Sequence, residues 1–133
     1  MDFKEKKKYL TVHRNCLFKI TNLKKQLKKV KDSLEIKGIS YSYTPKGNGL
    51  TLEELTIEKI DLEERIARLK EENRKRRKII ENALDKMENK KFAEIIDMYY
   101  LKGFDDIDIS DKLRNHARTI EKNRKKAINQ IEL

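Results

Sequence analysis

The sequence predicts an all-α fold, in which a long antiparallel helical hairpin of coiled-coil type precedes a small three-helix domain. Apolar residues recur in steps of four and three over two long stretches, as they do in helices that pack together. Only four glycines and one proline occur among the 133 residues, so little of the chain suits turns. Charged residues make up 42% and aromatic residues 7%, a composition that favours long helices over a thick globular core.

The first helix is expected over residues 4–34, with its apolar stripe packed against another helix. His13 lies on this stripe and is expected to be packed or partly exposed rather than to bind a ligand. Cys16 is expected to be a small apolar neighbour, because the sequence offers no second thiol for a disulfide or a metal site. The stripe consists of Tyr9, His13, Cys16, Ile20, Leu23, Leu27, Val30 and Leu34.

A loop is expected at residues 37–50, which contain the only proline and three of the four glycines. The second long helix should begin near Thr51, because Thr51 and Glu54 have the spacing of a capping box. Its apolar pattern is strongest over residues 52–69. The simplest arrangement folds this stretch back on the first helix as an antiparallel hairpin, and pairing between two chains is the alternative.

A third helix is expected over residues 91–102, with Gly103 as its C-terminal stop. It contains the densest apolar patch of the chain, formed by Phe92, Ile95, Ile96, Tyr99, Tyr100 and Leu101. This patch and the apolar residues that follow it are sufficient for a small core. The sequence therefore predicts a helical body at residues 1–90 and a separate domain at residues 91–133.

Two helices joined by a short turn are expected in residues 104–133. The apolar residues expected to face the core are Ile107, Ile109 and Leu113 in the shorter helix and Ile120, Ala127 and Ile131 in the longer one. Arg114, Asn115 and His116 interrupt the apolar pattern. Asn115 is the expected N-cap of the last helix, because its side-chain oxygen can accept a hydrogen bond from a free backbone N–H.

The last helix has a polar face opposite its apolar one. In a helical projection, Arg118, Lys122, Lys125 and Asn129 lie on the side away from Ile120. Residues 114–126 contain six basic residues and one acidic residue, whereas residues 92–113 contain two basic and six acidic residues. This contrast suits a helix that faces nucleic-acid phosphate beside a helix that does not, although a solvated basic face would look the same. The candidate DNA-binding residues are Arg114, His116, Arg118, Thr119, Lys122, Arg124, Lys125, Lys126 and Asn129.

The net charge of +10 favours a polyanionic partner, either nucleic acid or an anionic membrane surface. No apolar run is long enough to span a bilayer, and the N-terminus lacks the apolar stretch of a signal peptide, so a cytoplasmic location is expected. Residues 1–35 contain eleven basic and four acidic residues. These lysines either add a second, unspecific contact to phosphates or only keep the chain soluble.

Nothing in the sequence predicts an enzyme, and no catalytic residue, cofactor or metal is expected. No pair of carboxylates lies beside a histidine or a nucleophile in a recognisable motif. The two histidines are isolated from each other, and together with one cysteine they do not form a metal-ligand set.

The C-terminal segment, residues 92–131, resembles region 4 of bacterial sigma factors. The matching features are an apolar helix ending in Tyr-Tyr-Leu-Lys-Gly, a short helix with Leu113, and Ile120 and Ala127 at successive intervals of seven. The order of the whole chain resembles the RinA and ArpU families of phage-encoded transcriptional regulators. Two features depart from the pattern: residues 114–116 replace a small-residue turn with a serine N-cap, and residues 105–108 are unusually acidic.

This resemblance implies a DNA-binding helix-turn-helix protein that activates phage late or packaging genes in the bacterial cytoplasm. Its partners would be double-stranded DNA and host RNA polymerase, with a homodimer through the long helices as an open alternative and no membrane partner. Two other functional classes remain as alternatives. One is a helical adaptor or inhibitor that binds a protein, and the other is a phage terminase small subunit, which would assemble into a large ring.

Overall fold

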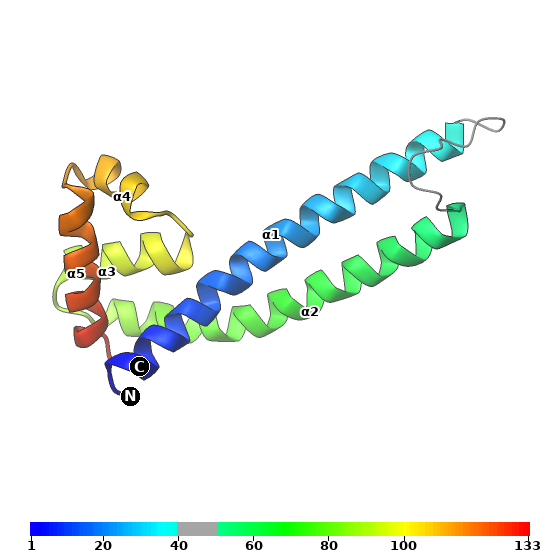
Figure 1. The fold of residues 1–133 in the computed structure, drawn as a ribbon. Coiled ribbons are helices and arrows are strands. Elements are labelled where there is room, and N and C mark those ends of the chain that lie inside the picture. Colours follow the sequence, from blue (N-terminus) through cyan, green and yellow to red (C-terminus); the bar gives the residue numbers. More distant parts are fainter. Residues whose placement is uncertain (40–50) are drawn as a thin grey trace. The chain divides into compact units, whose positions relative to one another are not determined.

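The computed structural model describes residues 1–39 and 51–133, and the regular structure in these residues is entirely helical. This confirms the all-α prediction. The chain divides into two compact units, which we call unit 1 (Met1–Phe18 with Glu72–Leu133) and unit 2 (Lys19–Glu71). The elements are α1 (Phe3–Ile39), α2 (Leu52–Asp85), α3 (Lys90–Ile96), a π-helical turn η1 (Asp97–Leu101), α4 (Asp106–Leu113) and α5 (Ala117–Gln130) (Figure 1).

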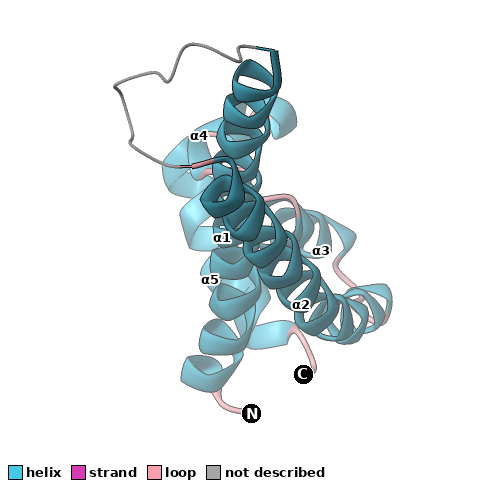
Figure 2. Ribbon diagram, turned by 90° about the vertical axis from the view of Figure 1, so that its right-hand side faces the viewer, coloured by secondary structure: helices cyan, strands magenta, loops and turns pink. Residues whose placement is uncertain are grey.

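Unit 2 contains the second half of α1 and the first half of α2. The two helices lie side by side and run in opposite directions within this unit (Figures 1 and 2). Their buried side chains occupy positions of the expected four-three pattern, although Leu52, at the start of that pattern in α2, is 53% exposed. The buried side chains are Ile20, Leu23 and Val30 of α1 and Leu55, Leu62 and Ile66 of α2.

The start of α2 has the predicted capping box. The backbone N–H of Glu54 donates to Thr51 Oγ1 at 3.1 Å, and the backbone N–H of Thr51 donates to Glu54 Oε2 at 3.1 Å. The end of α1 differs from the prediction, because the helix continues beyond Leu34 to Ile39. A glycine at position 38 costs only about 1 kcal/mol relative to alanine, which is not enough to stop a long helix. The rest of the predicted loop, residues 40–50, lies outside the described residues.

The larger core of unit 1 joins segments from both ends of the chain. Residues of α1, of the end of α2, of α3 with η1 and of the end of α5 are buried in one cluster. The first turns of α1 and the last turns of α2 therefore share this core with α3, η1 and α5. Its buried members are Leu10, Ile80, Ala83, Leu84, Met87, Ala93, Ile96, Tyr100, Leu101, Ala127, Ile128 and Ile131.

A smaller cluster in unit 1 holds α4 against α3, η1 and the first half of α5. It buries Ile95, Met98, Ile109 and Ile120, with Tyr99, Phe104 and Leu113 packed at its edge. Ile107 was predicted to belong to this core, and this prediction is wrong, since the side chain is 65% exposed. Residues two apart in a helix point about 200° away from each other, so Ile107 and Ile109 do not share a face.

The end of η1 is held by side chains of α1. The Lys102 N–H donates to the Asp97 carbonyl at 2.9 Å, and Gly103 at φ 78° ends the helix, as predicted. The last carbonyls of a helix lack partners within the helix. The Tyr99 carbonyl accepts from Arg14 Nε at 3.0 Å, and the Tyr100 carbonyl bonds to His13 Nδ1 at 2.9 Å. These two bonds fix the first half of α1 to η1.

His13, which was expected to be packed or partly exposed, is fully buried. Its Nδ1 must carry the proton to donate to the Tyr100 carbonyl, and its Nε2 has no hydrogen-bond partner among the described residues. Burial lowers the pKa of His13 below its usual 6.5, although the Tyr100 carbonyl opposes this, and the positive charges of Arg77 and Arg76 lower it further. The lowered pKa favours the neutral imidazole in the folded protein at neutral pH.

This neutral histidine makes stability depend on pH. The unfolded chain takes up a proton as the pH falls through about 6.5, whereas the folded chain takes it up only at a lower pH, so acid favours unfolding. We expect the free energy of unfolding to fall by up to about 1.4 kcal/mol for each pH unit below that value. Denaturant titrations between about pH 7.5 and about pH 5.5 measure this slope. His13→Gln should flatten it, whereas His116→Gln, at an exposed histidine, should not. Equal slopes in wild type and His13→Gln would contradict the assignment of this pH dependence to His13.

Candidate nucleic-acid interface

The turn between α4 and α5 sets where the last helix begins. Arg114 adopts the left-handed conformation (φ 55°), and the N–H groups of Arg114 and Asn115 both donate to the Ser110 carbonyl. Asn115 is therefore part of the C-terminal cap of α4, and α5 begins one residue later than predicted. The N-cap is His116, whose side chain makes no capping hydrogen bond, so the prediction of Asn115 as N-cap is wrong.

One face of α5 is buried in unit 1. Ile120 contacts the smaller cluster and Ala127 contacts the larger one, as the apolar spacing predicted. Ile128, which the sequence analysis did not include, is also fully buried. Ile131 lies just beyond the helix end and is buried as well. The helix is thus fixed along its whole length, at its start by α3 and α4 and at its end by α1 and α2.

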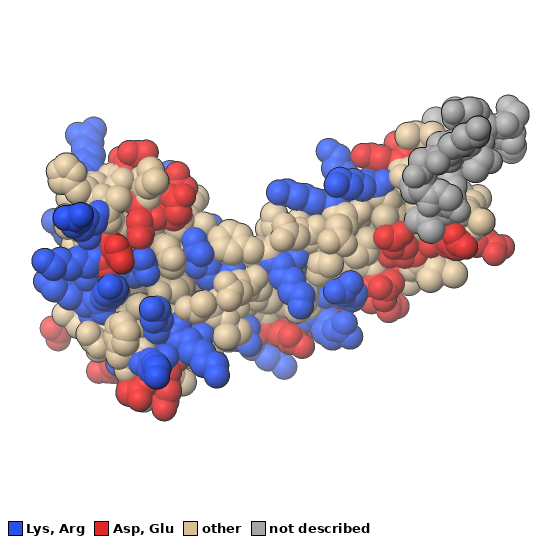
Figure 3. All heavy atoms as spheres, viewed as in Figure 1, with Lys and Arg blue, Asp and Glu red and all other residues tan. Residues whose placement is uncertain are grey.

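The opposite face of α5 is exposed and mostly cationic or polar. Figure 3 shows Lys and Arg side chains gathered over this helix. A shallow hollow of about 330 Å³ on this face is lined by Arg118, Thr119, Glu121, Lys122 and Lys125. The single acid among them, Glu121, lies 3.7 Å from Lys125, and both side chains are exposed, so this ion pair contributes little stability.

The structure places eight of the nine candidate residues in exposed positions. Arg114 and His116 lie in the turn before α5, and the other six lie along α5 itself. The six are Arg118, Thr119, Lys122, Lys125, Lys126 and Asn129.

Arg124 is the exception, because its side chain is directed into unit 1. Its Nε and Nη2 donate to the two carboxylate oxygens of Asp106 at 3.3 and 2.9 Å, and only 11% of the side chain is exposed. Burial alone would lower the pKa of Arg124, but the Asp106 carboxylate outweighs burial and raises it. The guanidinium carbon also lies 3.9 Å from the centre of the Tyr99 ring. Arg124 therefore joins α5 to α4 and η1.

Arg14 of α1 uses the same aromatic ring. Its guanidinium carbon lies 4.0 Å from the centre of Tyr99 and 4.7 Å from that of Phe18. Cation–π contacts of this kind contribute about 0.5–2 kcal/mol each, depending on how far they are desolvated. A continuous set of contacts thus links α1 to α5 and α4 through Arg14, Tyr99, Arg124 and Asp106. Sequence reasoning missed it, although a helical projection puts Arg124 only about 40° from Ile120, on the apolar side of α5.

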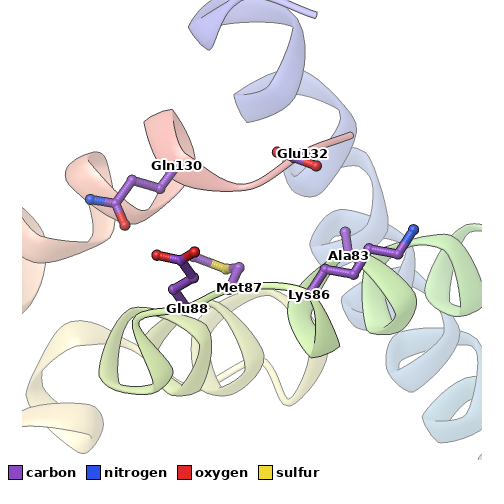
Figure 4. A pocket seen from close by; sticks show the side chains of 6 residues that line it. All are labelled: Ala83, Lys86, Met87, Glu88, Gln130 and Glu132. Carbon is purple, nitrogen blue, oxygen red and sulfur yellow. The ribbon is translucent and has the colours of Figure 1, made fainter.

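A second hollow, of about 400 Å³, lies between the end of α2 and the residues that end and follow α5 (Figure 4). It is lined by the polar residues Lys86, Glu88, Gln130 and Glu132 and by the apolar residues Ala83 and Met87. Two carboxylates and one ammonium group give it an acidic balance, which disfavours a polyanion. The exposed face of α5 is therefore the better match for nucleic acid.

None of the helices in residues 1–39 and 51–133 combines the length and the apolar character needed to cross a membrane. The same residues contain no cluster of three or more His, Cys, Asp or Glu side chains placed to hold a metal ion.

Comparison with known proteins gave no match to a family model, to a curated protein or to a solved structure.

Proposed function

We propose that this protein is a sequence-specific DNA-binding transcriptional regulator, in which α4 and α5 act as a helix-turn-helix on a hairpin formed by α1 and α2. The observation that supports this most directly is the exposed cationic and polar face of α5 opposite a fully buried one. In this proposal α5 enters the major groove of DNA. Arg118 and Lys122 contact base edges or phosphates, and Thr119 contacts the backbone.

The other exposed candidates divide by position. Arg114 and His116 lie at the N-terminal end of α5, where a recognition helix comes nearest to the bases. Lys125, Lys126 and Asn129 lie along its second half and are assigned to phosphates. Arg124 is assigned a supporting role, because its charge is already paired with Asp106.

The resemblance to the RinA and ArpU families extends the proposal to activation of phage late or packaging genes in the cytoplasm of a bacterial host. Activation would require a contact with host RNA polymerase besides the contact with DNA. In vitro transcription from a template that the protein binds tests this step. Added protein should raise transcript yield, and an unchanged yield at saturating occupancy would contradict it.

Binding to a pool of duplex fragments from the source genome tests the DNA-binding proposal. We expect one upstream sequence to be enriched, and the enrichment to persist when the salt concentration is raised from about 50 to about 200 mM. Binding that is uniform across sequences and disappears at the higher salt would mean that only the net positive charge acts. That result would contradict a sequence-specific regulator.

A protein-binding adaptor is the second candidate function, and one observation favours it. Ile57 and Ile60 of α2 are 68% and 52% exposed, and they lie on the side of the helix away from Leu55 and Leu62. Exposed isoleucines at helical spacing are typical of a surface that binds another helix. Acidic residues outnumber basic ones in residues 52–71 by seven to four, so pairing of this face with its own copy in a homodimer is electrostatically unfavourable.

A further inference from the structure

We infer that the first turns of α1 carry a second phosphate-binding site, formed by Lys4, Lys7 and Lys8, near the C-terminal end of α5. The inference rests on the proposed function and names a DNA contact outside the helix-turn-helix. Its ligand is the sugar-phosphate backbone of the duplex, recognised by charge and without regard to base sequence.

The structure places this part of α1 beside the C-terminal end of α5. Lys6 Nζ donates to the Asn129 carbonyl at 3.3 Å, across 123 positions of sequence. Leu10 is buried in the same cluster as Ile128 and Ile131, and Phe3 and Leu133 pack against that cluster. The position of the first turns of α1 relative to α5 is therefore fixed by a shared core as well as by a polar contact.

The lysines project from a capped helix rather than from a loose end. The Glu5 N–H donates to Asp2 Oδ1 at 2.8 Å, and the Lys6 N–H donates to the Asp2 carbonyl at 3.0 Å. Lys4, Lys7 and Lys8 are all exposed, whereas Phe3 and Lys6 turn inward. Spacings of three and four residues keep Lys4, Lys7 and Lys8 on neighbouring parts of one helix surface. A pre-ordered set of charges loses less entropy on binding than a flexible tail does.

The geometry of a bound duplex brings phosphates to this site. A helix of 14 residues is about 21 Å long, whereas the major groove is only about 12 Å wide. If the N-terminal half of α5 lies in the groove, its last turn lies at the level of the flanking backbone. Asn129, which Lys6 contacts, is in that last turn. Figure 3 shows Lys and Arg side chains over α5, and both basic and acidic side chains where the N-terminal end of α1 lies.

The dependence of DNA affinity on salt concentration tests the inference. The variant Lys4→Gln/Lys7→Gln/Lys8→Gln is compared with wild type on one fixed duplex between about 50 and about 200 mM salt. Each lost phosphate contact should lower the slope of log affinity against log salt by about 0.9, so we expect a decrease of about 2 to 3. Preference for one sequence over another should stay unchanged, because these contacts carry no base information.

The matched control is Lys86→Gln/Lys90→Gln/Lys91→Gln, which removes the same charge from exposed lysines of unit 1 that belong neither to α5 nor to the first turns of α1. Its slope should stay near that of wild type. An equal decrease in both variants would show that only net charge matters, and no decrease in the first variant would show that the lysines do not contact DNA. Either result overturns the inference.

If the proposed function is wrong, the binding data will differ from those expected when only this inference is wrong. Wild-type protein would then bind all duplexes alike, while the change in slope at Lys4, Lys7 and Lys8 would still be measurable on any of them. If wild-type protein binds no duplex even at the lower salt concentration, both the proposed function and the inference are overturned. Far-ultraviolet circular dichroism of each variant verifies that the helices are retained.

Discussion

Replacing Arg118 and Lys122 by alanine is expected to abolish sequence-specific DNA binding without unfolding the protein. Both side chains are exposed on the outer face of α5, and both line the shallow hollow on that face. A side chain that contacts a base edge contributes about 1–3 kcal/mol of discrimination. Loss of two such contacts should weaken binding to the preferred sequence by about 30-fold to about 10⁴-fold. Fluorescence anisotropy with a labelled duplex measures this loss.

The control variant removes two positive charges from residues of unit 1 that lie outside α5. Lys86 and Lys91 are exposed, and neither belongs to α5, so Lys86→Ala/Lys91→Ala changes the net charge equally. It should reduce affinity slightly and for all sequences alike. Thermal melting should match wild type for both double variants, since exposed substitutions of this kind usually change stability by less than about 0.5 kcal/mol. Unchanged affinity in Arg118→Ala/Lys122→Ala would count against α5 as the recognition helix.

Local sequence patterns predicted the helices and several of their buried positions well, because these patterns depend on geometry that every helix shares. The four-three spacing identified the buried positions Ile20, Leu23 and Val30, and the capping box placed the start of α2. The position of Gly103 predicted the end of the third helix, and its positive φ supplies the reason. Each of these predictions needed only residues within a few turns of one another.

Two predictions that rested on the type of a single residue, at Asn115 and at Ile107, were wrong. Asn115 is a better N-cap than histidine by residue type, but the left-handed Arg114 draws the Asn115 N–H into the end of α4. Ile107 was assigned to the core by its side chain alone, although its spacing from Ile109 excludes a shared face. In both cases the local backbone geometry overrode the preference of the residue.

Contacts between distant segments were not predictable from spacing. The bonds from His13 and Arg14 to the carbonyls of η1 join residues more than 80 positions apart. They also depend on the π-helical turn, which the sequence analysis did not predict. A count of charges treats all cations alike, so it assigned Arg124 to DNA together with its exposed neighbours. Only the position of Asp106 and Tyr99 relative to α5 separates it from them.

Asp106→Ala is therefore expected to destabilise the protein far more than Asp108→Ala does. It leaves the Arg124 guanidinium without its carboxylate in a site where only 11% of the side chain is exposed. Breaking a buried ion pair costs about 3–5 kcal/mol, and because 26% of the Asp106 side chain is exposed we expect about 2–3 kcal/mol. Asp108→Ala is the matched control, since Asp108 also lies in the first turn of α4 but is exposed. It should cost less than about 1 kcal/mol. Denaturant titration of both variants measures the difference.

The pairing itself is tested by changing both partners. Asp106→Ala combined with Arg124→Met removes the unpaired charge and keeps a side chain that can lie on Tyr99, so part of the lost stability should return. Simple addition of the two single effects would contradict a direct interaction.

DNA affinity then shows whether Asp106 acts by positioning α5 or only through its charge. The two roles predict opposite changes in affinity when Asp106 is replaced by alanine. Asp106→Ala makes the protein more positive, so charge alone predicts tighter binding, as it does for Asp108→Ala. If Arg124 holds α5 in place through Asp106, the loosened helix should instead bind its preferred sequence more weakly, under conditions where the variant remains folded. Tighter binding by both variants would show that the orientation of α5 does not depend on this pair.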